Sequence, residues 1–396
     1  MNKVRFFSEK INVQNKRIIL RLDLNVPIIE KKIQDNSRIM MCIPFIKTLI
    51  KKKAKIIIIS HLGRPKGFKD NSLSLMPVYK FLKEKIQTNI YFYAGDINKE
   101  TKEKFSYLKE GEIILLENIR FFDGEIKDDE KFSKMLASLG DMYINDAFSC
   151  SHRKQASVHG ITKYVKESYA GPLLNKEISA INAVIHDKKK PITCIIGGSK
   201  ISTKISVISN LIKNVDNIVI VGAMANNFLT FKGIKVGKSL LEKGANEIIA
   251  KIYSEAEKNN CNIIIPVDCN VSKDFAGTGK IKEIDSVDEN EIILDIGFKT
   301  IKNIENIINR SNTVLWNGPA GYFENENFLI GTTAIAKKIS ENTENKSLIS
   351  ILGGGDTISA INKHKNKFFF THLSTAGGAF LEFLEGKDLP GINVLK

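Results

Sequence analysis

Residues 55–67 read KIIIISHLGRPKG, a short apolar run that breaks at Ser60 into a polar loop. Similar short apolar runs recur along the chain, and longer helix-like stretches separate them. Strands of this length that alternate with helical periods indicate βαβ units and parallel sheets. We therefore predict an α/β fold with strands at Arg17–Leu22, Lys55–Ile59, Glu112–Leu116 and Asp141–Ile144 in the first half, and at Ile192–Ile196, Asn217–Val221, Asn262–Ile265, Thr313–Trp316, Leu348–Leu352 and Phe368–Thr371 in the second.

The length of the chain predicts two domains, because 396 residues exceed what one ordinary hydrophobic core holds. A boundary is indicated near Gly171-Pro172, and residues 173–187 are predicted to form a helix that joins the halves. A second βαβ series opens at Pro191, with further helices expected over Ser239–Asn259 and Thr357–Lys363.

The composition argues against a membrane protein and against a secreted protein. No stretch approaches the ~20 apolar residues of a membrane span, and the N-terminus lacks the apolar centre of a secretory signal. The five cysteines are scattered without a CxxC pair, which favours reduced, buried thiols in the cytoplasm over disulfides or a zinc site.

The formal net charge of +15 has two readings. It could reflect a nucleic-acid partner. It could also reflect a biased composition in which Lys, Ile and Asn are all abundant and Lys solvates every face. We favour the second reading, since no stripe of aromatic and basic residues and no nucleic-acid fold signature is present, and we expect neither a nucleic-acid nor a membrane partner.

Arginine is rare in this chain, with eight among 59 basic residues, and its placement is informative. Ligands bind at the carboxyl ends of parallel strands, and the guanidinium fork matches phosphate and carboxylate oxygens. Singly, each arginine also has a structural reading: a turn residue, a surface ion pair, or a pair between Arg120 and Glu117. Together they predict an anion pocket, formed by residues at or near the ends of the first-half strands: Asp23, Asn25, His61, Arg21, Arg38, Arg64, Arg120, His152 and Arg153.

The second half offers glycine-rich loops in place of a P-loop. Gly233–Ser239 resembles a Walker A sequence but has three residues between its glycines where the motif needs four, so we expect Ser239 to cap the next helix instead. Gly197–Lys200 follows a strand and precedes a helix over 201–211, one face of which would carry Lys200 and Lys204. Gly353–Thr357 joins a strand to a helix whose amides suit phosphate, with Asp356 either holding Mg²⁺ or capping the helix. No GxGxxG turn is found, which disfavours a nicotinamide-dependent dehydrogenase.

The motifs, taken together, resemble one family, the phosphoglycerate kinases. They run in family order from about Arg21 to the end of the chain: RLDLNVP, SHLGRPKG, LLENIRFFDGE, NDAFSCSHR, GGSKISTKI, IVGAMANNFL, LWNGPAGYFE, GGGDT and HLSTAGGAFLEFLEGKDLP.

The resemblance implies two Rossmann-like domains, each a parallel sheet flanked by helices, joined by a helix and hinge. Residues 1–172 with 379–396 would bind 3-phosphoglycerate, and residues 173–378 would bind the nucleotide. The implied activity is reversible phosphoryl transfer from 1,3-bisphosphoglycerate to Mg-ADP, giving 3-phosphoglycerate and Mg-ATP, in glycolysis and gluconeogenesis. A cytoplasmic monomer is the family expectation.

The resemblance also assigns roles to residues. The implied triose-binding set is Asp23, Asn25, Arg38, His61, Leu62, Gly63, Arg64, Arg120 and Arg153. The implied nucleotide-binding set is Lys204, Glu324, Gly354, Gly355, Asp356 and Thr357, with Asp356 as the Mg²⁺ ligand. Arg38 and Lys200 would stabilise the phosphoryl group during transfer.

Three positions depart from the family pattern: Gln155 replaces a histidine, Ser199 an alanine and Ala376 a glycine. Ala376 matters only if its position needs a positive φ. No nucleophile–base pair is evident, and none is required, because the substrate carboxylate, with a pKa near ~4, is already ionised at neutral pH. Positioning and electrostatics would then suffice for direct in-line transfer, with the two domains closing to exclude water.

Overall fold

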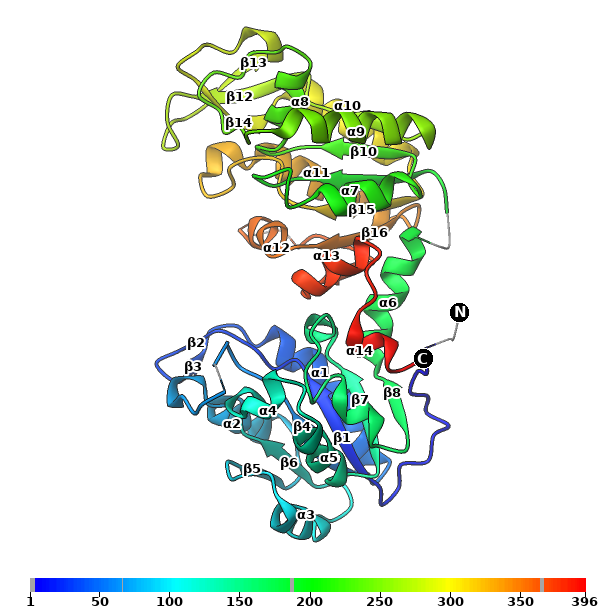
Figure 1. Ribbon diagram of the computed structural model, residues 1–396. Helices are drawn as coiled ribbons and strands as arrows, with labels where there is room; N and C mark the ends of the chain where they lie inside the picture. Colours follow the sequence, from blue (N-terminus) through cyan, green and yellow to red (C-terminus); the bar gives the residue numbers. More distant parts are fainter. Residues whose placement is uncertain (1–3, 66, 186–188, 364–366) are drawn as a thin grey trace. The chain divides into compact units, whose positions relative to one another are not determined.

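Two six-stranded parallel sheets organise the chain in the computed structural model, which describes residues 4–65, 67–185, 189–363 and 367–396 (Figure 1). The chain divides into two compact units. Unit 1 consists of the chain up to Glu177 together with the C-terminal residues Asp388–Lys396. Unit 2 consists of Ile178–Lys387. The predicted α/β class with two parallel sheets is confirmed.

The sheet of unit 1 has the strand order β5-β6-β4-β1-β7-β8. Its central strand pairs in parallel with both neighbours, so that Leu20 lies opposite Ile58 and Ile144. The strands are β1 Arg17–Leu22, β4 Lys55–Ile59, β5 Ile90–Tyr93, β6 Ile113–Leu116, β7 Met142–Asp146 and β8 Ser168–Ala170. Its α-helices are α1 Ser37–Lys51, α2 Met76–Lys85, α3 Lys99–Ser106, α4 Asp123–Ile126, α5 Glu130–Ser138, α6 Pro172–Ile185, which crosses into unit 2, and α14 Pro390–Asn393.

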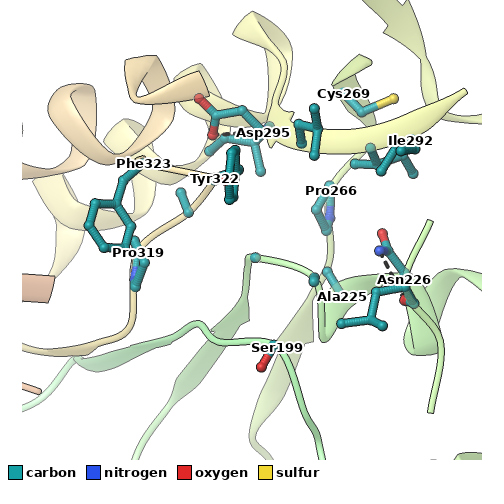
Figure 2. Close-up of a pocket in the computed structure, with 18 of the residues that line it drawn as sticks. Ser199, Ala225, Asn226, Pro266, Cys269, Ile292, Asp295, Pro319, Tyr322 and Phe323 are labelled. Carbon is teal, nitrogen blue, oxygen red and sulfur yellow. Dashed lines mark hydrogen bonds between the residues drawn. The ribbon is translucent and has the colours of Figure 1, made fainter. Parts of the chain in front are cut away.

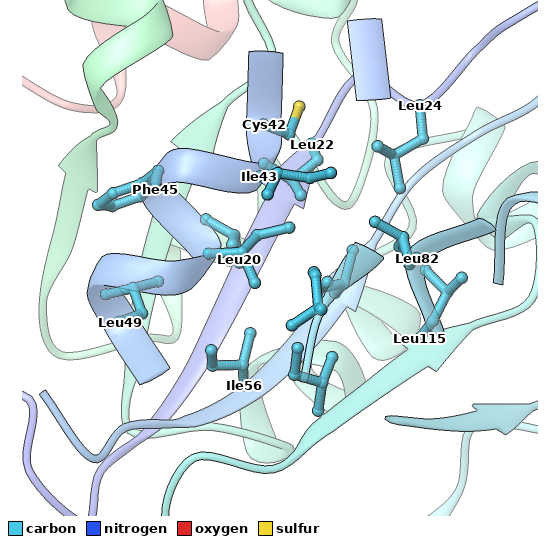
Figure 3. Close-up of a cluster of buried hydrophobic side chains, with 14 of the residues drawn as sticks. Leu20, Leu22, Leu24, Cys42, Ile43, Phe45, Leu49, Ile56, Leu82 and Leu115 are labelled. Carbon is cyan, nitrogen blue, oxygen red and sulfur yellow. The ribbon is translucent and has the colours of Figure 1, made fainter. Parts of the chain in front are cut away.

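One face of this sheet is covered by α1 and α2 (Figure 3). Leu20 and Leu22 of β1 face Ile43, Leu49 and the other buried side chains of α1. Because successive strand residues point to opposite faces, Ile19 and Arg21 of β1 lie on the other face. Both faces are buried, so the strands consist mostly of apolar residues.

The sheet of unit 2 has the order β11-β10-β9-β15-β16-β17. Helices α10 and α11 contribute Ile304 and Ile335 to a core on one of its faces, around Trp316. The strands are β9 Ile192–Ile196, β10 Asn217–Ile220, β11 Asn262–Ile264, β15 Thr313–Asn317, β16 Ile349–Gly353 and β17 His372–Ser374. The α-helices are α7 Ile205–Ile212, α8 Ala225–Phe231, α9 Ala245–Lys258, α10 Phe298–Arg310, α11 Ile330–Glu344, α12 Gly355–Asn362 and α13 Gly378–Leu384.

The remaining strands of the described residues form two small antiparallel sheets. Strands β12 Asp268–Ser272, β13 Lys280–Glu283 and β14 Ile292–Ile296 form a sheet in the order β13-β12-β14, and β2 Ile28–Ile29 pairs with β3 Lys32–Ile33. The parallel pattern did not predict them. Among the described residues, no helix is long and apolar enough to cross a bilayer.

The observed division of the chain differs from the predicted domain limits at both ends of unit 2. The first boundary lies five residues later than predicted, inside α6, and residues 186 and 187 of the predicted connecting helix lie outside the described residues. Residues 379–387 were predicted to return to the first domain, but they group with unit 2. Helix α13 contacts α7 of unit 2, where Asn210 donates a hydrogen bond to the Leu384 carbonyl at 2.7 Å.

Some predicted elements are wrong in position. The segment Phe368–Thr371 is not a strand; Phe368 and Phe370 pack against the core of unit 2, and β17 starts at His372. The helix predicted to begin at Ser239 begins at Ala245, because the Ser239 hydroxyl accepts a hydrogen bond from the Ile293 amide of β14. Lys200 and Lys204 do not share a helix face, since α7 begins only at Ile205.

Candidate active site

The loops that follow β1 and β4 are tied together at the carboxyl end of the first sheet. The Leu24 amide donates to Ser60 Oγ at 3.0 Å, and the Gly63 amide donates to Asn25 Oδ1 at 2.9 Å. The Ser60 hydroxyl in turn donates to the Leu22 carbonyl. Asn25 and Gly63, predicted from separate motifs, are therefore brought into contact.

Arg38 reaches the same strand ends from the first turn of α1. Its Nη1 donates to Asp23 Oδ2 at 2.9 Å and to the Asn25 carbonyl at 3.1 Å. Ser149, which follows β7, donates its hydroxyl to the same Asp23 oxygen at 2.5 Å. Arg38 and Asn25 line an open cavity of about 350 Å³. The ion pair of Arg38 thus lies beside a cavity at the sheet end.

Arg120 follows β6 and turns toward the same loops. Its Nη1 donates to the Gly63 carbonyl at 2.8 Å, and its Nη2 donates to Gln155 Oε1 at 3.3 Å. The alternative pair with Glu117 is excluded, because the Glu117 carboxylate accepts from Ser74 and Leu75 instead. Gln155, a departure from the family pattern, therefore serves as an acceptor for Arg120.

The remaining predicted triose-site residues differ in exposure. Leu62 is buried, and its carbonyl accepts from Asn118 Nδ2 at 2.7 Å. Arg64 is exposed and Arg153 is half-buried. Neither guanidinium forms a side-chain hydrogen bond or ion pair within the described residues, so both retain their donors for a ligand.

His61 is a neutral imidazole in this setting. Burial lowers its pKa well below the usual value, and the guanidiniums of Arg21, Arg120, Arg153 and Arg38 lower it further. Arg21 Nη2 lies 3.1 Å from His61 Nδ1. An arginine can only donate, so Nδ1 accepts and the ring proton is on Nε2.

Unit 2 contains a cavity of about 430 Å³, and two of the predicted nucleotide-binding residues, Glu324 and Asp356, line it (Figure 2). Pro319, Tyr322 and Phe323 line one side, and Ala225, Pro266 and Ile292 lie across from them. Ser199, Glu324 and Asp356 supply polar groups to the lining. A mostly apolar cavity with a few polar groups is the usual form of a site for a small molecule or cofactor.

Glycines let two loops meet beside this cavity. A Cβ on Gly318 would lie 2.3 Å from the Gly197 carbonyl carbon, and one on Gly197 would lie 2.3 Å from the Pro319 oxygen. Gly318 also has a φ of +108°. Lys204 Nζ donates to Asn317 Oδ1 at 2.5 Å, so its ammonium lies beside the residue that precedes Gly318. Asn317 was quoted within a motif but not predicted as a site residue.

The loop between β16 and α12 presents backbone amides and one carboxylate. Gly354 has a φ of +103°, and Gly355 has open space where a side chain would be. Thr357 is buried, and its hydroxyl accepts from the Gly318 amide at 2.7 Å, which ties this loop to the previous one. The alternative in which Asp356 caps the helix is wrong, since Gly354 occupies the N-cap position.

The position of Asp356 suits a ligand of Mg²⁺. Its carboxylate is exposed, lines the cavity and follows the phosphate-type turn. Mg²⁺ commonly binds through one or two carboxylates together with substrate phosphates, and within the described residues no cluster of three or more metal-ligating side chains offers another site. Burial lowers the pKa of Lys204, while Asp356 and then Glu385 act in the opposite direction.

The other predicted positions are placed as follows. Lys200 is exposed in the loop between β9 and α7, and Ser199 beside it lines the cavity. Ala376 is not among the residues with positive φ, and its amide donates to Ser374 Oγ at 3.3 Å, so alanine is accommodated without strain. The predicted triose-site residues thus all belong to unit 1 and the predicted nucleotide-site residues to unit 2.

Comparisons with known proteins show which family the chain belongs to. The family profile "Phosphoglycerate kinase" matches residues 8–387. The phosphoglycerate kinase of Wolbachia sp. subsp. Drosophila simulans is 44% identical over 391 residues, covering 98% of each chain. That of Buchnera aphidicola subsp. Schizaphis graminum is 45% identical over 391 residues, covering 98% of this chain and 97% of its own.

Solved structures show the same fold. The phosphoglycerate kinase of Coxiella burnetii superposes with a TM-score of 0.91 at 38% identity, and that of Pyrococcus horikoshii OT3 with a TM-score of 0.81 at 30% identity. Each comparison covers 98% of both chains. The chain therefore belongs to the phosphoglycerate kinase family.

Proposed function

We propose that unit 1 binds the triose substrate and unit 2 binds the magnesium nucleotide, and that the phosphoryl group passes directly between them. The observation that carries this proposal is the pair of unlike sites, each at the carboxyl end of its own sheet. One has several guanidiniums around Asp23 and Asn25, and the other has an apolar cavity beside glycine-rich loops.

In the triose site, guanidinium groups suit the phosphate and carboxylate of 3-phosphoglycerate. Arg38, Arg64, Arg120 and Arg153 would supply the charge. Asp23 and Asn25 can bind the substrate hydroxyl, and the backbone of Leu62 and Gly63 shapes the loop. His61 serves as a neutral donor and not as a base, because Nδ1 already accepts from Arg21.

In the nucleotide site, Lys204 and the amides of Gly354–Thr357 would hold phosphates, Glu324 the ribose and Asp356 the metal. Mg²⁺, when bound, neutralises charge on the phosphate chain. The base would lie in the slot between Ala225 and Phe323 that Figure 2 shows.

The reaction needs no general base on this chain. The attacking carboxylate is already ionised, so the obstacle is repulsion between two anions. Arg38 and Lys200 offset that repulsion by placing positive charge beside the phosphoryl oxygens. We also propose a cytoplasmic location, since all five cysteines are buried free thiols, which fits a reducing compartment.

A coupled assay with 3-phosphoglycerate, ATP and Mg²⁺ tests this assignment of the two sites. Asp356→Asn should raise the Mg²⁺ concentration needed for half-maximal rate more than tenfold, and Glu289→Gln, which removes an exposed carboxylate of the same unit, should leave it unchanged. An unaltered Mg²⁺ dependence in Asp356→Asn would remove the proposed metal ligand.

A further inference from the structure

Arg21 is fully buried beneath the proposed triose site. It projects from β1, has no exposed surface, and uses three nitrogens as donors. Nε donates to Ser157 Oγ at 3.0 Å, Nη1 donates to the Leu22 carbonyl at 2.5 Å, and Nη2 donates to His61 Nδ1 at 3.1 Å. The guanidinium plane is therefore fixed from three directions.

A buried carboxylate compensates this buried cation. Glu125, in α4, has no exposed surface. Its Oε1 accepts from the Ser157 hydroxyl at 2.7 Å, and its Oε2 accepts from the Ser157 amide at 2.7 Å. The Ser157 carbonyl accepts from Tyr143 of β7 at 2.7 Å, which holds the serine backbone. Burial raises the pKa of Glu125, and Arg21 opposes that rise.

This arrangement determines the tautomer of His61. Arginine stays protonated in proteins and cannot accept a hydrogen bond, so a proton on Nδ1 would face the Nη2–H of Arg21 and is disfavoured. Within the described residues Nε2 has no hydrogen-bond partner, and it is the nitrogen that remains for a ligand. The charged and titratable groups around the Arg21–His61 pair are Asp23, Arg38, Arg120, Glu125, Tyr143, Cys150 and Arg153.

We propose that Arg21, held by Ser157 and Glu125, is a positioning residue that keeps His61 as a neutral imidazole with its proton on Nε2, ready to donate to an oxygen of the triose substrate. Direct contact with substrate is not part of the role of Arg21. The inference rests on the proposed function in placing His61 at the triose site. Its tautomer, however, is a property of the ligand-free protein.

The consequence for binding is a donor that does not change with pH. A free imidazole near its ordinary pKa of about 6.5 would titrate within the physiological range and would exchange between two tautomers. With Arg21 in place, the affinity of the triose site for substrate should not depend on the ionisation of this histidine between pH 5.5 and pH 8, which we take as the test range of roughly one unit below to 1.5 units above that pKa.

The test combines nitrogen NMR of the ligand-free protein with kinetics. His61→Gln identifies the His61 signals among the six histidines. We expect the wild-type ring to show the Nε2–H pattern throughout the range. In Arg21→Lys a single flexible ammonium replaces the fork, so His61 should populate both tautomers. KM for 3-phosphoglycerate should then rise about tenfold, while kcat changes less than about twofold.

Two further variants serve as a control and as an alternative to Arg21→Lys. Arg17→Lys, on the same strand but paired with Asp141 at the surface, should alter neither the NMR pattern nor KM. Ser157→Ala removes the hydroxyl that joins Arg21 to Glu125 and leaves every charge in place, and it gives the same readouts if Arg21→Lys does not fold. A wild-type His61 with its proton on Nδ1, or folded variants that retain the Nε2–H tautomer and the wild-type KM, would overturn the proposal.

Discussion

The Arg38 guanidinium uses one nitrogen, Nη1, to bind both the Asp23 carboxylate and the Asn25 carbonyl. Its plane is therefore set by two strand-end loops before substrate arrives. A fork held in this way loses little further freedom on binding an anion. Lysine would bring the same charge without the plane.

We predict that Arg38→Lys lowers kcat/KM more than tenfold, because the ammonium cannot reproduce the orientation of the fork toward the transferring group. Steady-state kinetics in the direction of ATP consumption measures this. Lys47→Ala, on the exposed side of the same helix α1, is the control and should leave kcat/KM within about twofold of wild type. Equal rates in the two variants would contradict a geometric role for Arg38.

At the scale of the secondary-structure elements, most strands of the two parallel sheets were predicted from their short apolar runs, but β5 and β8 of the first sheet were missed. Strands β1, β4 and β9 begin and end as predicted, since buried parallel strands leave a continuous apolar run in the sequence. Strand β12 was missed because its polar residues Asp268 and Asn270 are buried with partners from other segments. Exposed β13, with alternating charges, carried no such signal.

The site was predictable to the extent that its residues follow strands. Asn25, Gly63 and Arg38 meet as expected at the end of the first sheet. Their partners could not be predicted, because Ser149 lies 126 positions from Asp23 along the chain. The link from Arg21 through Ser157 to Glu125 likewise depends on a local 3D arrangement of β1, α4 and the segment after β7.

The close approach of the loops after β9 and β15 predicts a steric requirement. Gly318→Ala should destabilise the protein by about 3 kcal/mol, because it combines a positive φ with a Cβ placed against the Gly197 backbone. Gly233→Ala is the matched control: its φ of +80° is similar, but nothing lies within 4 Å of the added Cβ, so about 1 kcal/mol is expected. Urea unfolding compares the two, and equal losses would show that backbone conformation alone matters.

Helix α6 begins with a buried carboxylate as its cap. Asp146, at the end of β7, accepts from the Leu173 and Leu174 amides at 2.7 and 2.9 Å. Its other oxygen is buried without a hydrogen-bond partner in the part of the chain that the structure describes. Burial raises the pKa of Asp146 to about 7, and the two amides oppose the rise.

This pKa predicts a pH-dependent stability. Between about pH 4 and the folded pKa, Asp146 binds a proton in the folded state but not in the unfolded chain. Protonation of Asp146 therefore stabilises the folded state, and this stabilisation is lost as the pH rises through that window. Within this window the contribution of Asp146 to the free energy of unfolding falls by at most about 1.4 kcal/mol per pH unit. Asp146→Asn keeps the acceptor oxygen and removes the titration. Measured by urea unfolding, the stability of the variant relative to wild type should increase from pH 5 to pH 8, which lie on either side of the pKa of about 7. Parallel pH profiles would refute this.

At the scale of the whole molecule, direct transfer sets a condition that neither unit meets alone. The proposed triose-site residues belong to unit 1 and the proposed nucleotide-site residues to unit 2, yet the reacting atoms must come within about 3–3.5 Å for in-line transfer. Binding of both ligands should therefore draw the units together and exclude water that would hydrolyse the acyl phosphate.

Small-angle X-ray scattering tests this prediction with 3-phosphoglycerate and Mg-ADP, a pair that occupies both sites without turnover. We expect the radius of gyration to decrease with the pair and to change less with either ligand alone, since only the pair can bridge the two units. Arg38→Lys with the same ligands, at concentrations that saturate both sites, should show a smaller decrease, because the fork is proposed to face the transferring group. A radius that stays constant when both sites are saturated would mean that the phosphoryl group cannot pass directly, and the in-line mechanism would fail with it.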